Sequence, residues 1–97
     1  MLAMIKSFGD RQTEALFGDR FVREFQGVAR SAKRKLEMLN AAGRLDDMLV
    51  PPSNRLEKLQ GSLSEFYSIR INDQWRITFK WIDGHAHAVR VMEYYLG

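Results

Sequence analysis

Apolar and polar residues alternate along positions 67–81, on both sides of a short polar segment at 72–74. Alternation with a period of two predicts two β-strands that each bury one face, joined as an antiparallel hairpin. A one-residue slip would turn one strand inside out, so the apolar faces coincide only if the loop has an odd number of residues. The three-residue loop meets this condition. The apolar face then contains Tyr67, Ile69, Ile71, Trp75, Ile77, Phe79 and Trp81.

The opposite face of this hairpin carries an unusual cross-strand pair. The register places Arg70 opposite Arg76 and Ser68 opposite Thr78, with Lys80 on the same face. Like charges directly across a strand pair are destabilising. The ordinary interpretation is a set of solvated side chains on an exposed sheet face. Cations and hydroxyls on a rigid sheet also suit phosphate binding, and we therefore expect an anion site on this exposed face.

The N-terminal half of the chain is predicted to contain a strand and two helical segments. A short strand is expected at 4–8 and a helical turn at 13–17, closed by Gly18. Apolar residues at three- and four-residue spacing then predict a helix over 19–42, with Asp19 as its N-cap and Gly43 as its stop. The charged residues between them indicate a solvated outer face. The apolar positions are Phe21, Phe25, Val28, Ala32, Leu36 and Leu39.

The C-terminal half is predicted to be a meander of strands. After an irregular segment at 43–54, strands are expected at 55–60, 65–71, 74–81 and 85–95. Asp83 and Gly84 form the strongest two-residue hairpin signal in the chain. The order predicts an α+β domain, with an N-terminal strand and two helices packed on one face of a mainly antiparallel sheet of about five strands.

The register of the last strand follows from its turn. A two-residue turn at 83–84 pairs Trp81 with Ala86 and Lys80 with His87. An unbroken register then puts Val89, Val91, Glu93 and Tyr95 on the arginine face and turns Arg90 inward. Two alternatives remain open for this imperfect pattern, a β-bulge that corrects it or an outer face that is only partly wet.

Composition narrows the class of protein. The 97 residues fit one domain, 1–97, and 45% hydrophobic with 28% charged residues is typical of a soluble globular protein. A net charge of +3 favours a polyanionic partner. The absence of cysteine excludes disulfides and thiol catalysis. No run of apolar residues has membrane-spanning length and no signal peptide is evident, so we expect a cytoplasmic location without membrane contact.

Three weaker motifs are explained more simply by ordinary structural roles than by function. Asp46 and Asp47 are adjacent acids in a loop without a partnering histidine, and His85 and His87 form a metal-type pair without further ligands. Trp75 and Trp81 can stack on bases, but their alternation with core positions favours burial, more strongly for Trp75. We therefore predict no metal and no cofactor.

With these motifs in hand, the chain resembles the HigB-type killer toxins of the RelE/ParE superfamily. The resemblance rests mainly on Tyr-Ser-Ile-Arg-Ile-Asn-Asp-Gln-Trp-Arg-Ile at 67–77, supported by short blocks at 5–8, 32–36, 51–57 and 59–61. It implies a RelE/ParE-like fold and a ribosome-dependent mRNA endonuclease that inhibits translation. It further implies a HigA-like helix-turn-helix antitoxin as partner, with operator DNA bound only through the antitoxin complex.

The resemblance also assigns site residues. Arg70 and Arg76 match the basic positions that hold mRNA phosphates, and Glu93, Tyr94 and Tyr95 match a C-terminal pattern that is commonly Asp-Tyr-His. The implied chemistry is metal-independent attack of a ribose 2′-hydroxyl on the adjacent phosphate, with arginine stabilising the charge. Proton transfer falls to Glu93, Tyr95 or, less readily, His87. The predicted catalytic residues are Arg70, Arg76, Glu93 and Tyr95, and the predicted RNA-binding residues are Ser68, Thr78, Lys80 and Lys58.

Two other functions fit the same superfamily. One is a non-catalytic, ParE-like inhibitor of a protein target such as gyrase. The other is a diverged toxin that acts only as antitoxin partner and co-repressor. The paired arginines favour the nuclease, whereas the tyrosine in place of the C-terminal histidine favours an alternative.

Overall fold

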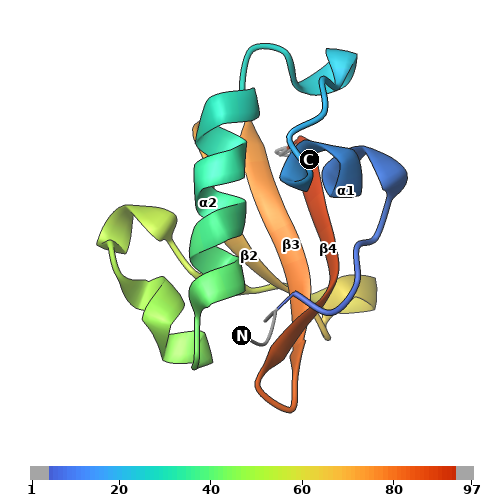
Figure 1. The fold of residues 1–97 in the computed structure, drawn as a ribbon. Coiled ribbons are helices and arrows are strands. Elements are labelled where there is room, and N and C mark those ends of the chain that lie inside the picture. The colour runs from blue at the N-terminus through green and yellow to red at the C-terminus, as the bar shows by residue number, and fades with distance from the viewer. Residues whose placement is uncertain (1–4, 94–97) are drawn as a thin grey trace.

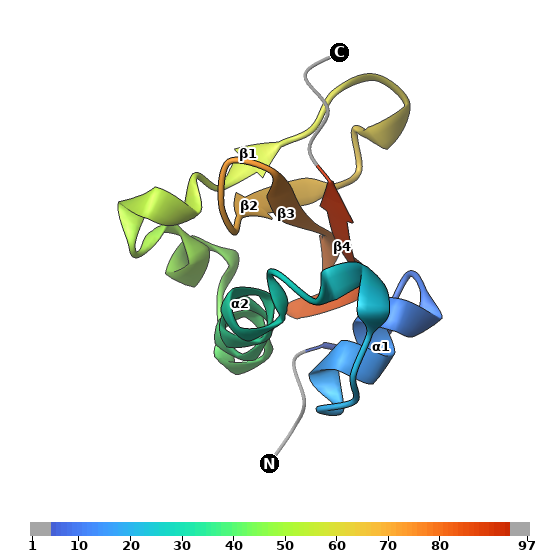
Figure 2. The same ribbon diagram turned by 90° about the horizontal axis from the view of Figure 1, so that it is seen from above.

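The computed structural model of the chain describes residues 5–93, and the α+β class predicted from sequence is confirmed in this region. Within it, four strands form one antiparallel sheet in chain order. Helices α1 and α2 both contact this sheet and lie on the same side of it (Figures 1 and 2). The elements are α1 (Arg11–Phe17), α2 (Ala29–Ala41), β1 (Glu57–Lys58), β2 (Tyr67–Arg70), β3 (Trp75–Ile82) and β4 (His85–Glu93).

The predicted N-terminal strand is the first difference. Its described part forms only two isolated parallel bridges, Ile5 with Ala86 and Phe8 with Val89, along the outer edge of β4. The chain leaves this edge after Gly9 because Asp10 begins α1, with its carboxylate accepting a hydrogen bond from the Thr13 amide at 2.8 Å. The sheet therefore has four strands in the described region rather than about five, and Met4 lies outside that region.

The predicted long helix is shorter than its apolar spacing indicated. Helix α2 begins at Ala29, and Asp19 has a φ of 66° in the turn after α1, so it does not cap the helix. Between them the chain forms a 3-10 turn, Arg23–Phe25. Phe25 and Val28 are buried there without belonging to α2, because the spacing reports burial and not only helical periodicity. The helix ends at Ala41, close to the predicted stop.

The central hairpin has the predicted register. Arg70 pairs with Arg76 and Ser68 with Thr78. The first pairs of β3 with β4 are also as predicted, Lys80 with His87 and Trp81 with Ala86.

A bulge then shifts β4 by one residue, which decides between the two alternatives for this strand. The register changes between Thr78 and Lys80, next to Ala88 with its φ of 52°. Val89 and Val91 turn into the core as a result. Met92 now pairs with Arg76, and Glu93 pairs with Trp75. Alternation therefore puts Met92 rather than Glu93 on the arginine face, and Glu93 reaches that face only at its rim, at the end of the strand.

The remaining predicted strands are shortened at their ends. The strand expected at 55–60 is only Glu57–Lys58, and that expected at 65–71 is Tyr67–Arg70. The segment before them forms two 3-10 turns, Leu45–Leu49 and Pro52–Asn54. The fully buried Asn54 holds this segment, because its amide donates to the Met48 carbonyl at 3.1 Å and its oxygen accepts from the Lys35 ammonium at 2.5 Å.

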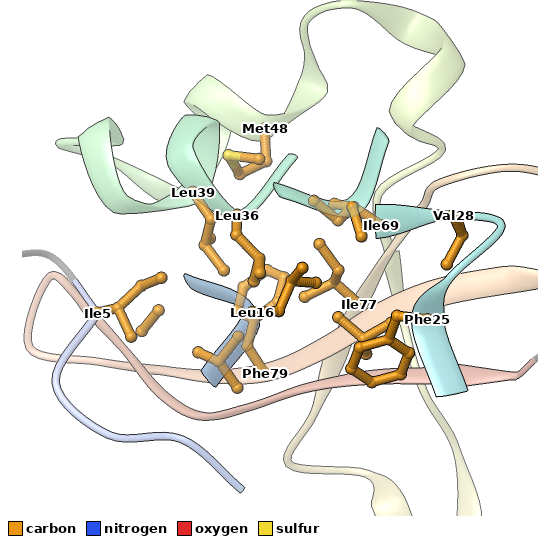
Figure 3. Packing of buried hydrophobic residues seen from close by; sticks show 14 of the residues in the cluster. Ile5, Leu16, Phe25, Val28, Leu36, Leu39, Met48, Ile69, Ile77 and Phe79 are labelled. Carbon is orange, nitrogen blue, oxygen red and sulfur yellow. The ribbon is translucent and has the colours of Figure 1, made fainter. Parts of the chain in front are cut away.

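The hydrophobic core lies between α2 and the sheet. Figure 3 shows Leu36 and Leu39 of α2 facing the residues of β2 and β3, and Ile69, Ile77 and Phe79 are fully buried there. One face of the sheet is thus committed to packing, which leaves the other for polar chemistry. Residues 5–93 contain no helix with the length and apolar character that a membrane crossing needs.

Candidate functional site

The face of the sheet that α1 and α2 leave uncovered contains a cavity of about 180 Å³, which we call the arginine groove. Alternation along β3 directs Arg76 and Thr78 to this face and Ile77 to the core. The groove is lined by Leu59, Leu63, Ser68, Arg76, Thr78, Met92 and Glu93.

Arg76 is the centre of the arginine groove and is buried rather than exposed. Only 9% of the residue is accessible, whereas an exposed position was expected for an arginine on the outer face of the sheet. Its Nη1 donates to the Ser68 hydroxyl at 2.5 Å and to the Glu57 carboxylate at 2.9 Å. A guanidinium held on two sides is fixed in orientation, as recognition of a phosphate requires.

Glu57 is the functional candidate that the sequence did not indicate. It enters the site because β1 pairs Glu57 with Ser68, which places the carboxylate on the same face as Arg76. Its side chain remains 54% exposed, so the carboxylate is open to a ligand. Strand β1 has only two residues, so no alternation in the sequence marks its outward face.

Arg70 lies opposite Arg76 but turns to a different partner. Its guanidinium forms an ion pair with Asp73 in the hairpin loop, and 30% of its side chain is exposed. Arg76 points instead toward β1. Each arginine therefore has its own carboxylate, and these two ion pairs offset the cost of placing like charges across the strands.

The predicted hydroxyl residues support the groove from within. Ser68 is fully buried and accepts the hydrogen bond from Arg76, and Thr78 donates from Oγ1 to the Met92 sulfur at 3.3 Å. Both hydroxyls are thus engaged with neighbours in the groove.

The two predicted lysines are separated by the sheet. Lys80 lies on the arginine face, with its Nζ 3.8 Å from the Glu65 carboxylate and 5.3 Å from the centre of the Phe66 ring. Lys58 pairs with Tyr67 and stacks over its ring at 5.4 Å. Because Tyr67 pairs with the buried Phe79, Lys58 belongs to the other face, and the structure does not bring it to the groove.

The predicted C-terminal residues are partly visible. Glu93 reaches the rim of the groove from the position after Met92 and accepts a hydrogen bond from the Gln74 amide at 2.9 Å. Tyr95 lies outside the described residues. His87 pairs with Lys80, farther along β3 from Arg76 than Thr78 is.

The weaker motifs have structural explanations. The Asp47 carboxylate accepts hydrogen bonds from the amides of Gly43 and Arg44 at 2.9 and 3.2 Å, which caps the 3-10 turn. Trp75 packs edge-on against Phe25 with ring centres 5.6 Å apart, in keeping with a core role. Across residues 5–93, no three potential ligands among histidine, cysteine, aspartate and glutamate cluster closely enough to hold a metal ion.

The fold is shared with a chain of a solved protein complex. A chain of the YoeB–YefM complex from Staphylococcus aureus superposes with a TM-score of 0.57 over 94% of this chain and 98% of that one. The two are 20% identical, so the likeness concerns the fold alone. It defines the class as a small α+β protein with helices on one sheet face.

The family follows from the sequence match. Residues 6–95 match the family described as RelE-like toxin of type II toxin–antitoxin system HigB, and the chain belongs to this family. It is 51% identical over 53 residues to Toxin HigB-1 of Vibrio cholerae, a match covering 55% of this chain and 56% of that toxin. An uncharacterized protein of Haemophilus influenzae is 34% identical over 65 residues, which cover 67% of this chain and 64% of that protein. The resemblance noted in the sequence is thereby confirmed.

Proposed function

We propose that this toxin is an endoribonuclease that cleaves mRNA on the ribosome and so stops translation. The observation that carries the proposal is the buried Arg76, held beside the accessible Glu57 carboxylate in a groove of the uncovered sheet face. A fixed cation next to a carboxylate supplies two of the functions that phosphodiester cleavage by a ribose hydroxyl needs.

The proposed reaction needs no group from outside the RNA and the protein. The ribose 2′-oxygen attacks the adjacent phosphorus and loses its proton to Glu57. The bond from phosphorus to the 5′-oxygen breaks, which leaves a 2′,3′-cyclic phosphate and a 5′-hydroxyl. Arg76 stabilises the negative charge that develops on the phosphorane oxygens. Glu93 at the groove rim, or Tyr95, protonates the departing 5′-oxygen.

The other cations of this face extend the proposed RNA path. Arg70 lies across from Arg76, and Lys80 lies four residues beyond Arg76 on β3, which corresponds to about 13 Å along a strand. Three cations on one face of the sheet suit a phosphate backbone that passes across it. Lys58, on the other face, takes no part in this path.

We also propose a HigA-like antitoxin as the partner that silences the groove. The family is that of toxins from toxin–antitoxin pairs, and the structural neighbour was solved in a complex, that of YoeB with YefM. The expected antitoxin is a helix-turn-helix protein, and operator DNA is bound through it. Co-expression is expected to restore growth, and the two proteins are expected to co-purify.

The decisive experiment is to induce the protein in cells and map the 5′ ends of ribosome-bound mRNA. New 5′ ends inside translated regions, absent with the Glu57→Gln variant, are expected. Growth arrest without new 5′ ends would refute the nuclease and favour an inhibitor of a protein target such as gyrase. Normal growth together with antitoxin binding would favour a diverged toxin that acts as co-repressor.

A further inference from the structure

The outer edge of β4 is held by two different parts of the N-terminal segment. Up to Val89, backbone groups cover it, since the Val89 amide donates to the Ser7 carbonyl at 3.1 Å and the Gly9 amide donates to the Val89 carbonyl at 2.8 Å. The Ser7 hydroxyl also accepts from the Ala88 amide at 2.9 Å. The chain then turns into α1, which lies beside β4 in Figures 1 and 2.

Beyond Val89, a side chain takes over this edge. The Thr13 hydroxyl, which is fully buried, accepts a hydrogen bond from the Val91 amide at 2.9 Å. A buried backbone amide without an acceptor is costly, so this contact determines where Val91 lies. Thr13 thus replaces the strand that is missing at this point of the edge.

Asp10 connects the same two elements a second time. One carboxylate oxygen accepts from the Thr13 amide at 2.8 Å, and the other accepts from Arg90 Nε at 3.2 Å. The four residues Asp10, Thr13, Val91 and Arg90 form a closed set of contacts between α1 and β4. Gly9 makes room for it, because a Cβ there would lie 2.2 Å from Cγ of Arg90.

The residues that follow this set line the arginine groove. Met92 is the next residue after Val91, pairs with Arg76 and accepts from the Thr78 hydroxyl. Glu93 follows and lines the groove as well. The bulge changes the register of β4 just before this point. The strand end is then held by β3 on one edge and by the Thr13 hydroxyl on the other.

We propose that Thr13 and Asp10 are positioning residues that set Met92 and Glu93 against Arg76. This inference rests on the proposed function of the arginine groove, although neither residue touches the groove through its own side chain. Their contribution to cleavage is geometric, since a misplacement of about 1 Å in an active site lowers rates by as much as a hundredfold.

The test compares three variants in single-turnover cleavage of mRNA on programmed ribosomes. Thr13→Val keeps the shape and branching of the side chain and removes the acceptor, whereas Thr13→Ser keeps the hydroxyl. Ser7→Ala removes a side-chain acceptor from the same edge nearer the bulge and is the matched control. Urea unfolding of all three measures the general loss of stability, and Asp10→Asn takes the place of Thr13→Val if that variant does not fold.

We expect Thr13→Val to lower the cleavage rate at saturating ribosome concentration by roughly tenfold or more, as for a displaced catalytic geometry. The ribosome concentration at half-saturation is expected to be unchanged in Thr13→Val. The cleavage rates of Thr13→Ser and Ser7→Ala are expected to stay near that of the wild-type protein. Wild-type cleavage by Thr13→Val would overturn the inference. An equal loss in Ser7→Ala would do the same, because cleavage would then follow only the stability of the edge.

A second readout separates this inference from the proposed function. If the wild-type protein does not cleave mRNA, the proposed function fails. The positioning role is then tested by measurements on the free protein, without ribosomes. In that case hydrogen exchange at the Val91 amide and the methyl NMR signal of Met92 are expected to change in Thr13→Val and not in Ser7→Ala. An unchanged Met92 signal would overturn the inference whatever the protein's activity.

Discussion

The sharpest test of the arginine groove is the replacement of Glu57 by glutamine. Glutamine has the same length and still accepts a hydrogen bond from Arg76, but it carries no charge and cannot take the 2′-proton. The Glu57 side chain is 54% exposed and that of Arg76 is 11% exposed. Because the carboxylate is well solvated, loss of its charge is expected to lower the free energy of unfolding by less than about 1 kcal/mol.

The expected effect on catalysis is much larger. Loss of a general base commonly lowers a rate by about 10²–10⁴-fold, which is about 3–5 kcal/mol at the transition state. The comparison of these two magnitudes makes the variant informative, because a fold that remains nearly as stable cannot explain such a loss of rate.

The assay is single-turnover cleavage of mRNA on programmed ribosomes, with urea unfolding measured on the same preparations. Glu65→Gln is the matched control, since Glu65 has a side chain that is 79% exposed and pairs with Lys80 on the same face. We expect Glu65→Gln to cleave at nearly the wild-type rate. Wild-type cleavage by Glu57→Gln would refute the assignment of the base, and an equal loss in both variants would show that only the charge of the face matters.

Three further predictions concern stability. Arg76→Ala is expected to lower the free energy of unfolding by about 1–3 kcal/mol, because it leaves the buried Ser68 hydroxyl without its donor; urea unfolding checks this, and the exposed Arg30→Ala on α2 should have little effect. The pKa of Lys35 is lowered from its usual 10.5, mainly by burial of the ammonium group and secondly by the positive charge of the neighbouring Arg34. The unfolded chain therefore binds more protons at this site as the pH approaches 10.5, and wild-type stability relative to Lys35→Met should rise as the pH is raised toward that value. A constant difference would contradict it. Ala88→Gly should raise the midpoint of thermal unfolding, since the φ of 52° costs alanine about 1–2 kcal/mol and glycine loses only part of that gain to chain entropy; a lower midpoint would show that the bulge does not strain this residue.

The hairpin at the centre of the site was predictable because its constraints are local. A period of two, an odd loop and one buried face leave a single register, and that register pairs Arg70 with Arg76 as observed. The turn at 83–84 likewise determined the first pairs of β4. The family resemblance, which rested mainly on this hairpin, holds over residues 6–95.

Spacing misled where a residue is buried for a reason other than helical periodicity. Phe25 and Val28 continue the apolar stripe of α2 in sequence, yet they precede the helix and pack against the sheet. Their burial depends on contacts with distant residues such as Trp75. The helix propensity of residues 19–42 does not indicate which distant residues these side chains contact.

The tertiary structure alone decided the chemistry of the groove. The bulge at Ala88 exchanges Val91 for Met92 opposite Arg76, and alternation in the sequence is compatible with either arrangement. The two-residue strand β1 brings Glu57 to Arg76 from 19 positions away and buries the guanidinium. Sequence by itself determined which residues face outward along the long strands, because that depends on neighbours in the chain. Which charges meet depends on pairings between segments far apart in the chain, and only the folded sheet establishes them.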